Sequence, residues 1–380
     1  MRRASEVERR RLNETFAELC AIPSPFGRER TMAERVAREL RELGLDVEED
    51  DAAESAGAEC GNLLARIPAR SARSERVVLL CAHLDTVPHD GAVEPVLVDS
   101  GWESAGDTIL GADNKAAVAV LMALARRAVV EGSPVGVELL FTVSEENALA
   151  GAKAFDVGRL RSEFGFVFDH ASPIGEIVAG SPTYYRLEAS LHGKAAHAGI
   201  RPEAGRSAIL AAAKAIAAMR LGRIDDDTTA NVGSIAGGTG GTNVVPERCR
   251  ILAEARSLSE ASVEAVVADM VDHVYDAAND PSCECDADVV VERLIRGYRH
   301  KTSAPQVLAA EAALRACGYK PRRIFTGGAS DANAFEAAGF SCTNLANGTQ
   351  NNHEPSERVS QAALEGMLDV AFALLDELAP

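Results

Sequence analysis

The chain has 380 residues, of which 47% are hydrophobic and 25% are charged, as is usual for a globular protein and unlike a disordered or fibrous one. Its formal net charge of -18 argues against nucleic acid or an anionic membrane as the main partner, because phosphate surfaces are bound by clustered Lys and Arg. The length favours two domains over one.

The N-terminus and the cysteines indicate where the protein works. Charged, amphipathic sequence follows Arg2 and Arg3, and no stretch approaches the roughly 18 uninterrupted apolar residues of a membrane helix. The eight cysteines are scattered, which favours buried thiols in a reducing compartment over a disulfide framework. Cys283 and Cys285 lack a second pair at a zinc-finger spacing. We therefore expect a cytoplasmic protein without membrane contact.

Up to about residue 179, short apolar runs alternate with helical patterns. The runs at 76–82 (RVVLLCA), 137–143 (VELLFTV) and 165–168 (GFVF) are typical of strands in a sheet that is covered on both faces. Between the first two lies 115–127 (KAAVAVLMALARR), whose Ala and Leu content favours a helix. This alternation predicts an α/β domain.

The pattern changes near Gly180, where alternating strands and alanine-rich helices begin. The elements expected there are a strand at 184–192, a helix at 204–220, strands at 230–235 and 249–255, a helix at 260–278 and a strand at 287–294. The order β-α-β-β-α-β predicts a two-layer, ferredoxin-like α+β domain with an open sheet edge.

The α/β pattern resumes after this segment, with a helix at 306–317 and strands at 323–325 and 343–346. We therefore expect residues 180–296 to form an inserted domain, and residues 1–179 and 297–380 to form one mixed-sheet catalytic domain. The inserted domain is expected to act in dimerisation or as a lid.

Metal-capable side chains follow the three expected strands of the first domain. His83 and Asp85 follow the first strand, Glu145 and Glu146 the second, and Asp169 the third. Open α/β sheets place their sites at the carboxyl ends of parallel strands. Each residue alone has an ordinary structural explanation, but the set at one sheet edge favours a site.

Two further donors belong to this set. Asp113 begins the expected helix, where an aspartate also commonly serves as a cap, and His353 lies in the polar turn TQNNHEPSE after the last strand. Imidazole nitrogens together with carboxylate oxygens are typical of a site for two divalent ions such as zinc, cobalt or manganese.

A hydrolase with two metal ions needs one carboxylate that bridges ions about 3.5 to 4 Å apart. Another carboxylate, not bound to metal, must take the proton of the attacking water. The adjacent Glu145 and Glu146 suit this division, because in an irregular turn one can face the metal and the other the cleft. Asp85, two residues beyond His83, can hold the other N–H of the imidazole.

Eight runs occur in a recognisable order along nearly the whole chain. They are CAHLDTVP, GADNKAAVAVL, SEENALAGAKAF, FDH, HGKAAHAGI, GGTGGTNVVPERC, GGASDANAF and NNHEPSE. In combination they resemble the M20 metallopeptidases, and among these the peptidase T-like branch of tripeptide aminopeptidase relatives. The residue after Asp113 departs from the pattern, since Asn114 stands where Asp is frequent.

The resemblance implies a role for each donor. His83 and Asp169 would bind one metal ion, Glu146 and His353 would bind the other, and Asp113 would bridge them. The peptide bond after Asp113 would be cis.

The resemblance also implies catalytic and substrate-binding residues. Glu145 would be the general base and Asp85 the orienting carboxylate. His197 would donate a hydrogen bond to the developing oxyanion, usually across a dimer in the family. Asn243 and Arg256 would grip the terminal carboxylate or backbone of the substrate.

One more substrate-binding candidate lies two residues before His353, because Asn351 fits the N-x-H pattern of tripeptidase-like members. The inserted domain would close over the substrate by hinges at its two ends.

These expectations describe a homodimeric, zinc-type exopeptidase, an aminopeptidase that hydrolyses di- or tripeptides. The same centre also suits a carboxypeptidase or an N-acyl amino acid deacylase. A catalytically silent dimeric binding protein is the third alternative, but the presence of Glu145 beside all five ligands favours an enzyme.

Overall fold

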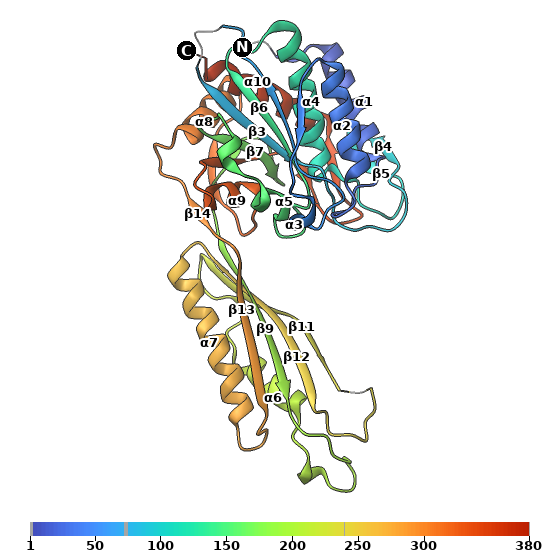
Figure 1. Cartoon of the computed structure of the whole chain (residues 1–380), viewed down its shortest axis with the longest axis vertical. Helices are drawn as coiled ribbons and strands as arrows, with labels where there is room; N and C mark the ends of the chain where they lie inside the picture. Colours follow the sequence, from blue (N-terminus) through green and yellow to red (C-terminus); the bar gives the residue numbers. More distant parts are fainter. Residues whose placement is uncertain (1–2, 72–74, 239, 380) are drawn as a thin grey trace. The chain divides into compact units, whose positions relative to one another are not determined.

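The computed structural model describes residues 3–71, 75–238 and 240–379. The chain divides into two compact units, residues 1–180 with 300–380 and residues 181–299 (Figure 1). The inserted segment thus begins one residue later and ends three residues later than the predicted 180–296. No helix in the described part of the chain combines the length and apolar character needed to cross a membrane.

The first unit is built on a mixed sheet. Its strands are β1 (Val47–Glu49), β2 (Leu63–Ile67), β3 (Val77–His83), β6 (Gly136–Thr142), β7 (Gly165–His170), β8 (Glu176–Ser181), β15 (Arg322–Phe325) and β16 (Cys342–Ala346). They lie in the order β1-β2-β6-β3-β7-β16-β8, with β15 beside β8. Because β6, β3, β7 and β16 are parallel, their carboxyl ends meet at one edge of the sheet.

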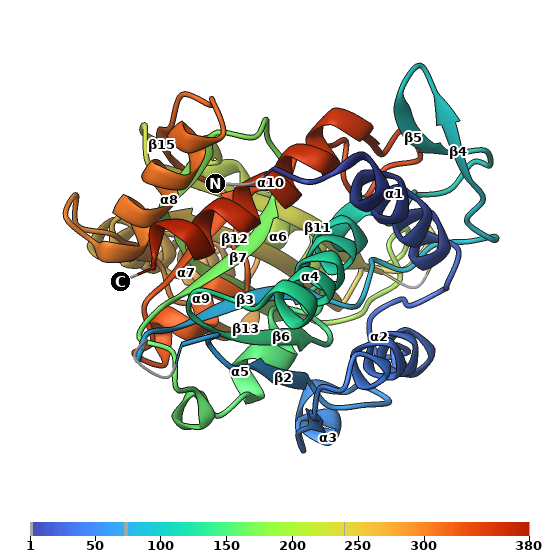
Figure 2. The ribbon, with the colours of Figure 1, turned by 90° about the horizontal axis from the view of Figure 1, so that it is seen from above.

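Helices cover both faces of this sheet, so its central strands are buried as their apolar runs predict. The helices are α1 (Glu6–Cys20), α2 (Arg30–Glu42), α3 (Ala53–Ala56), α4 (Ala112–Glu131), α5 (Ala150–Ala154), α8 (Pro305–Ala316), α9 (Asp331–Ala337) and α10 (Gln361–Glu377). Figure 2 shows α1, α4 and α10 on one side of β3 and β6, and α5 on the other.

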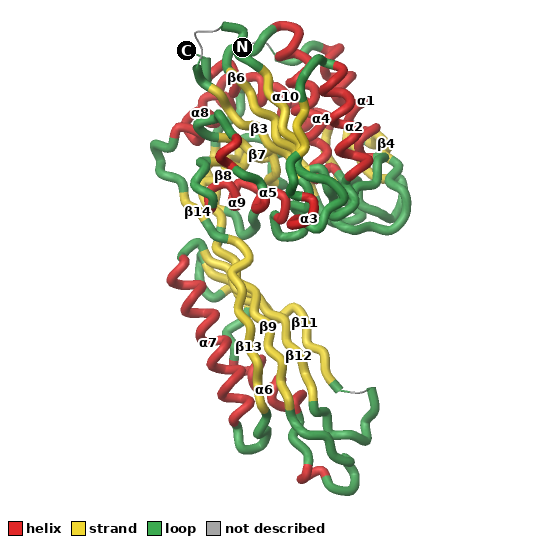
Figure 3. Tube along the Cα trace, viewed as in Figure 1, coloured by secondary structure: helices red, strands yellow, loops and turns green. Residues whose placement is uncertain are grey.

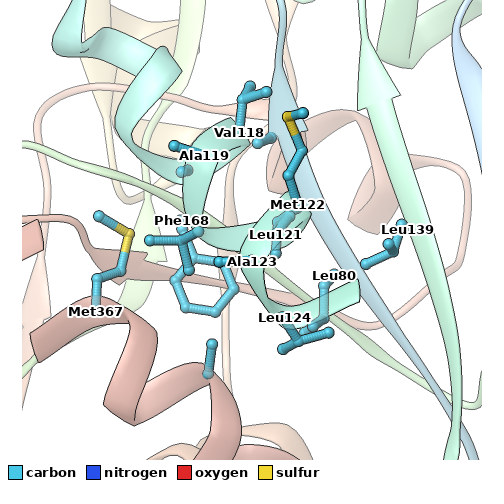
Figure 4. Packing of buried hydrophobic residues seen from close by; sticks show 14 of the residues in the cluster. Leu80, Val118, Ala119, Leu121, Met122, Ala123, Leu124, Leu139, Phe168 and Met367 are labelled. Atoms are coloured by element: carbon cyan, nitrogen blue, oxygen red, sulfur yellow. The ribbon is translucent and has the colours of Figure 1, made fainter. Parts of the chain in front are cut away.

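Helix α4 lies at the centre of the core. Its side chains Leu121 and Leu124 approach Leu80 of β3, and Phe168 of β7 lies between α4 and Met367 of α10 (Figure 4). All five side chains are almost completely buried. The core thus fixes the start of α4 and the ends of β3 and β7 relative to one another.

A small antiparallel sheet at the side of this unit was not predicted. It is formed by β4 (Pro95–Val98), β5 (Gly101–Ser104), β17 (Thr349–Gln350) and β18 (Arg358–Ser360), in the order β17-β18-β5-β4. The pairing of β17 with β18 closes the turn 351–357 that contains His353. The small sheet therefore positions one of the predicted ligands.

The second unit has the predicted two-layer architecture. Its elements are β9 (Thr183–His192), α6 (Ala208–Ala218), β10 (Gly222–Arg223), β11 (Thr228–Gly237), β12 (Arg248–Ser257), α7 (Glu260–Asn279), β13 (Asp286–Ile295) and the short β14 (Tyr298–Arg299). The sheet order β10-β11-β12-β9-β13 and two helices packed on the sheet give the ferredoxin-like arrangement (Figure 3). This unit has its own apolar core.

One helix in this unit is shorter than expected. Helix α6 starts at Ala208 and not at 204, because the Oγ of Ser207 caps it by accepting the N–H of Leu210. A separate turn, Pro202–Ala204, precedes it.

Candidate active site

The predicted donors gather at the carboxyl edge of β6, β3 and β7. His83 is the last residue of β3, Asp169 is the penultimate residue of β7, and Glu145 and Glu146 follow the end of β6. His83 is 1% exposed and Glu145 is 8% exposed, so these two residues lie largely out of water. The sheet edge thus brings together residues that are far apart in the sequence.

Asp113 reaches both predicted histidines with its two carboxylate oxygens. Its Oδ1 lies 3.3 Å from Nε2 of His83, and its Oδ2 lies 3.3 Å from Nε2 of His353. Nε2 of His83 is also 3.5 Å from Oδ1 of Asp169, and Nε2 of His353 is 2.8 Å from Oε1 of Glu146. Opposite oxygens of one carboxylate therefore face two different groups of donors.

Two donor groups result, and they share Asp113. We call His83, Asp113 and Asp169 the inner group, and Asp113, Glu146 and His353 the outer group. Within each group the ligand atoms lie within 4.8 Å of one another. The peptide bond between Asp113 and Asn114 is cis, as expected.

Glu145 lies close to both groups, and His83, Glu145 and Glu146 form a third cluster of candidate ligands. A carboxylate at this place is near any water held between the two donor groups. This geometry suits a proton acceptor next to the metal site.

Asp85 contacts both His83 and the turn that carries Glu145 and Glu146. Its Oδ1 lies 3.3 Å from Nδ1 of His83 and accepts the backbone N–H of Glu145 at 3.0 Å. Its Oδ2 accepts the backbone N–H of Glu146, also at 3.0 Å. Nε2 of His83 is thereby left to face Asp113 and Asp169, as metal-binding histidines require.

The turn after β6 is held from a second side. Ser144 has a left-handed backbone with φ of 50°. Its N–H and its Oγ both donate to Oε1 of the buried Glu29, at 3.1 and 3.0 Å. Glu29 and Asp85 together fix the backbone from Ser144 to Glu146.

The electrostatics of the site show an excess of negative charge. Burial raises the pKa of Asp169 well above its ordinary value, and the charge of Asp113 adds to this effect. Burial also raises the pKa of Glu145 and of Glu146. Hydrogen bonds to Asp113 and Glu146 raise the pKa of His353 to about 10. A divalent cation at each donor group would compensate this charge.

The donor set therefore fits two divalent cations. Imidazole nitrogens and carboxylate oxygens are ligands that zinc, cobalt and manganese accept, and the second ring nitrogen of His83 is already held by a carboxylate. Each donor group supplies three residues, so a catalytic cation with more than three ligands would complete its coordination with water or substrate.

The turn with His353 contains one predicted residue and one that was missed. Asn351 is exposed, and its Nδ2 donates to the carbonyl of Ser356 at 3.3 Å, so its role in substrate binding stays a prediction. The neighbouring Asn352 instead contacts the site, because its Nδ2 donates to Oδ2 of Asp113 at 2.8 Å. In sequence, the N-x-H pattern singled out Asn351, and nothing singled out Asn352.

Another missed residue is Asp331 in the run GGASDANAF. It is 1% exposed, and its Oδ2 accepts the hydroxyl of Thr142, the last residue of β6, at 2.5 Å. Its negative charge contributes to the raised pKa of Glu145. The acidic residue in a glycine-rich run was the available clue.

His197 and Asn243 lie beside each other in the second unit. His197 is exposed, and its Nδ1 accepts the N–H of Gly199 at 3.2 Å. The N–H of Ala198 donates to the carbonyl of Asn243 at 2.9 Å. His197 lies in the loop that follows β9, and Asn243 lies in the loop between β11 and β12.

Arg256 lies at the opposite end of this sheet. It is paired with Tyr184 near the start of β9, and its guanidinium lies 4.3 Å above the centre of the Tyr184 ring. It also donates to both oxygens of Glu254, at 3.0 and 3.1 Å. The nine residues from Tyr184 to His192 span roughly 27 Å of extended strand, so one subunit does not bring Arg256 and His197 together.

Family models match both units of the chain. Residues 183–280 match the peptidase dimerisation domain of M20 enzymes, and residues 62–171 match peptidase family M28. The first match covers most of the second unit. The second match covers all of the predicted ligands but His353.

Similar proteins of known structure extend over the whole length. The aminopeptidase PepT from Bacillus cereus is 36% identical, with 98% of this chain and 99% of that chain covered and a TM-score of 0.89. A tripeptidase from Staphylococcus aureus is 32% identical, with 98% of each chain covered and a TM-score of 0.92. The YqjE protein of Bacillus subtilis is 35% identical over 374 residues, which are 98% of this chain and all of that protein.

These similarities agree with the residues at the sheet edge. Identity above 30% over nearly the full length accompanies the same two-domain fold, and the donors expected of such an enzyme converge in this structure. The chain belongs to the peptidase T-like branch of the M20 metallopeptidases.

Proposed function

We propose that the protein is an aminopeptidase that removes the N-terminal residue from di- or tripeptides with the help of two divalent cations, zinc above all. The observation that supports this most is Asp113, whose two oxygens face the histidines of two separate donor groups. The names of the similar PepT aminopeptidase and tripeptidase support the choice of substrate. Zinc suits the mixed imidazole and carboxylate donors.

In this proposal, each of the five ligands has one task. His83 and Asp169 would hold the first cation, Glu146 and His353 would hold the second, and Asp113 would contribute to both. When bound, the two cations supply positive charge that polarises the scissile carbonyl and makes a water molecule more acidic.

Glu145 is the proposed general base. It accepts a proton from the attacking water and passes it to the leaving amine. In the metal-free protein, burial and then the charge of Asp169 raise the pKa of Glu145 well above its ordinary value. Asp85 keeps Glu145 in place through the backbone N–H of that residue.

We also propose a homodimer formed through residues 181–299, in which His197 of the partner subunit donates a hydrogen bond to the developing oxyanion. The match to the peptidase dimerisation domain supports the dimer. His197 and Arg256 are separated along β9, which supports a site to which each of the two copies contributes one of these residues. Arg256, Asn243 and Asn351 remain proposed substrate contacts.

A cytoplasmic location is proposed for the protein. All eight cysteines lie among the described residues and are buried thiols. Pairs such as Cys283 and Cys285 persist as thiols most readily in a reducing compartment.

The proposed function is tested by digesting a peptide library with metal-free enzyme and with enzyme reloaded with zinc or cobalt. We expect hydrolysis only after reloading, with single residues lost from the N-terminus and no cleavage of N-acetylated peptides. Mass spectrometry identifies the end that is trimmed. Loss of C-terminal residues, or release of an acyl group, would establish the carboxypeptidase or the deacylase instead.

A further inference from the structure

A buried glutamate that has no part in the proposed reaction lies at the base of the His353 turn. Glu357 is 1% exposed, and its Oε2 accepts the backbone N–H groups of Leu110 at 2.9 Å and Gly111 at 2.7 Å. Its Oε1 accepts the backbone N–H of Asp113 at 2.9 Å. One carboxylate thus satisfies three donors of the segment that carries the bridging residue.

These three hydrogen bonds determine the path of the chain into α4. Gly111 has a left-handed backbone with φ of 72°, and Asp113 follows it at the first turn of the helix. Leu110 is fully buried, so without Glu357 its N–H would lose its partner away from water. Both carboxylate oxygens are needed, because the donors approach the group from two sides.

The other end of this connection is the turn that holds His353. The N–H of Glu357 donates to the carbonyl of Glu354 at 3.0 Å, and the N–H of Glu354 donates to the carbonyl of Asn351 at 3.2 Å. His353 lies inside this turn with a left-handed φ of 68°. Glu357 therefore links the backbone of the His353 turn directly to the backbone of Asp113.

The outer donor group depends on this link more than the inner group does. His83 belongs to a central strand and is held by Asp85, whereas the side chain of His353 is 48% exposed and comes from a turn. Nε2 of His353 lies 3.3 Å from Oδ2 of Asp113. These two residues belong to the two segments that Glu357 connects.

We propose that Glu357 is a positioning residue that holds Asp113 and His353 in register and thereby sets the affinity of the outer donor group for its cation. This inference rests on the proposed use of two cations. It assigns a specific task to the acidic residue four places after His353.

The test is a stepwise titration of metal-free full-length enzyme with Co²⁺, followed by calorimetry and by the visible absorption of the bound ion. The variant is Glu357→Gln, which keeps the shape of the side chain but turns an N–H₂ donor toward one of the backbone donors. We expect the first Co²⁺ to bind as in wild type and the second to bind about 10- to 100-fold more weakly.

The matched control is Glu354→Gln, an exposed glutamate in the same turn, which should leave both binding steps unchanged. Glu357→Asp retains two acceptors and should bind the second Co²⁺ better than Glu357→Gln does, and it replaces that variant if the amide prevents folding. The melting temperature of each metal-free variant shows whether a change in binding follows from general loss of structure.

Two results would overturn the inference while leaving the proposed function intact. They are unchanged binding of both ions by Glu357→Gln, or equal weakening of both ions. If wild-type enzyme itself bound fewer than two ions, the proposed function would fail, and this inference with it.

Discussion

Asp85 contacts three groups that the proposed reaction needs. It holds the ring of His83 and the backbone N–H groups of Glu145 and Glu146, each at 3.0 to 3.3 Å. Because one rigid carboxylate sets both a ligand and the general base, small changes near this residue are expected to affect metal binding and proton transfer together.

The general base can be separated from the metal site by one substitution. In Glu145→Gln the amide cannot accept the water proton, so kcat for tripeptide hydrolysis should fall roughly 100- to 10,000-fold. The five ligands are unchanged, so two metal ions per subunit should remain by elemental analysis. Loss of one ion in this variant would make Glu145 a ligand, in line with its place in the third cluster.

Some residues of the site were predictable from the sequence and others were not. His83 and Asp169 follow strong apolar strands, so their position at the sheet edge follows from the pattern alone. Asn352 and Glu357 act on Asp113 and its loop from a turn more than 200 residues away in sequence. Nothing in their local sequence indicates that partner, since it depends on how the turn packs.

An ion pair between Glu8 of α1 and Arg127 of α4 connects the two helices. Glu8 also belongs to the N-terminal cap of α1. Both oxygens of Glu8 accept hydrogen bonds from Arg127, each at 2.6 Å, and the same side chain accepts the N–H of Ser5 at 2.7 Å. The guanidinium of Arg127 also lies 3.4 Å above the Phe372 ring. The start of α1 thus contributes to the packing of three helices.

This pair should make stability depend on acid pH. The hydrogen bonds from Arg127 lower the pKa of Glu8 from 4.5 to about 2. A lowered folded-state pKa means that the stabilisation is complete above pH 4.5 and is lost as the pH falls toward 2.

Glu8→Gln should therefore lower the free energy of unfolding by roughly 1 kcal/mol at pH 7, and by less as the pH approaches 3. Urea unfolding of the metal-free protein at several pH values measures this difference. Glu14→Gln, whose partner Arg10 is 3.9 Å away on the exposed side of α1, is the control with little expected effect. A difference between Glu8→Gln and wild type that is constant with pH would contradict the explanation.

At the level of elements, length decided what was predictable. Strand β3 has six apolar residues in a row, β6 and β7 each have three, and all three strands lie where expected. Strands β17 and β18 have two and three residues, too few for any periodicity, and they exist because β5 pairs with β18. The start of α6 was misplaced, because the alanine-rich run begins only at Ala208, after the Ser207 cap, and Ala204 belongs to the separate turn before it.

The whole molecule consists of two units with separate cores, and their order along the chain followed from the change of pattern near Gly180. The sequence alone did not show that His197 and Arg256 lie at opposite ends of one sheet. That separation depends on the pairing register of β9 with β12, which places Arg256 opposite Tyr184.

The proposed dimer predicts complementation between two inactive variants. His197→Ala should lower kcat by the equivalent of about 2.7 to 4 kcal/mol while its metal ions remain. Mixed with Glu145→Gln under conditions that exchange subunits, it should regain about a quarter of wild-type activity, because half of the dimers are mixed and each has one intact site.

Each variant alone, and a mixture that is not allowed to exchange, should stay inactive. Size-exclusion chromatography with light scattering verifies the exchange by the mass of the particle, given a chain of 40.0 kDa. Activity that does not return after exchange would place His197 and Glu145 in the same subunit's reaction.

The rate at which the buried thiols react reports the local unfolding of the core around each cysteine. Cys20, Cys60, Cys81, Cys317 and Cys342 belong to the first unit, and Cys249, Cys283 and Cys285 belong to the second. An alkylating reagent can reach each sulfur only when the surrounding core separates. The order in which cysteine-containing peptides acquire the label therefore reports the unfolding of each unit separately, in one experiment and without any introduced residue.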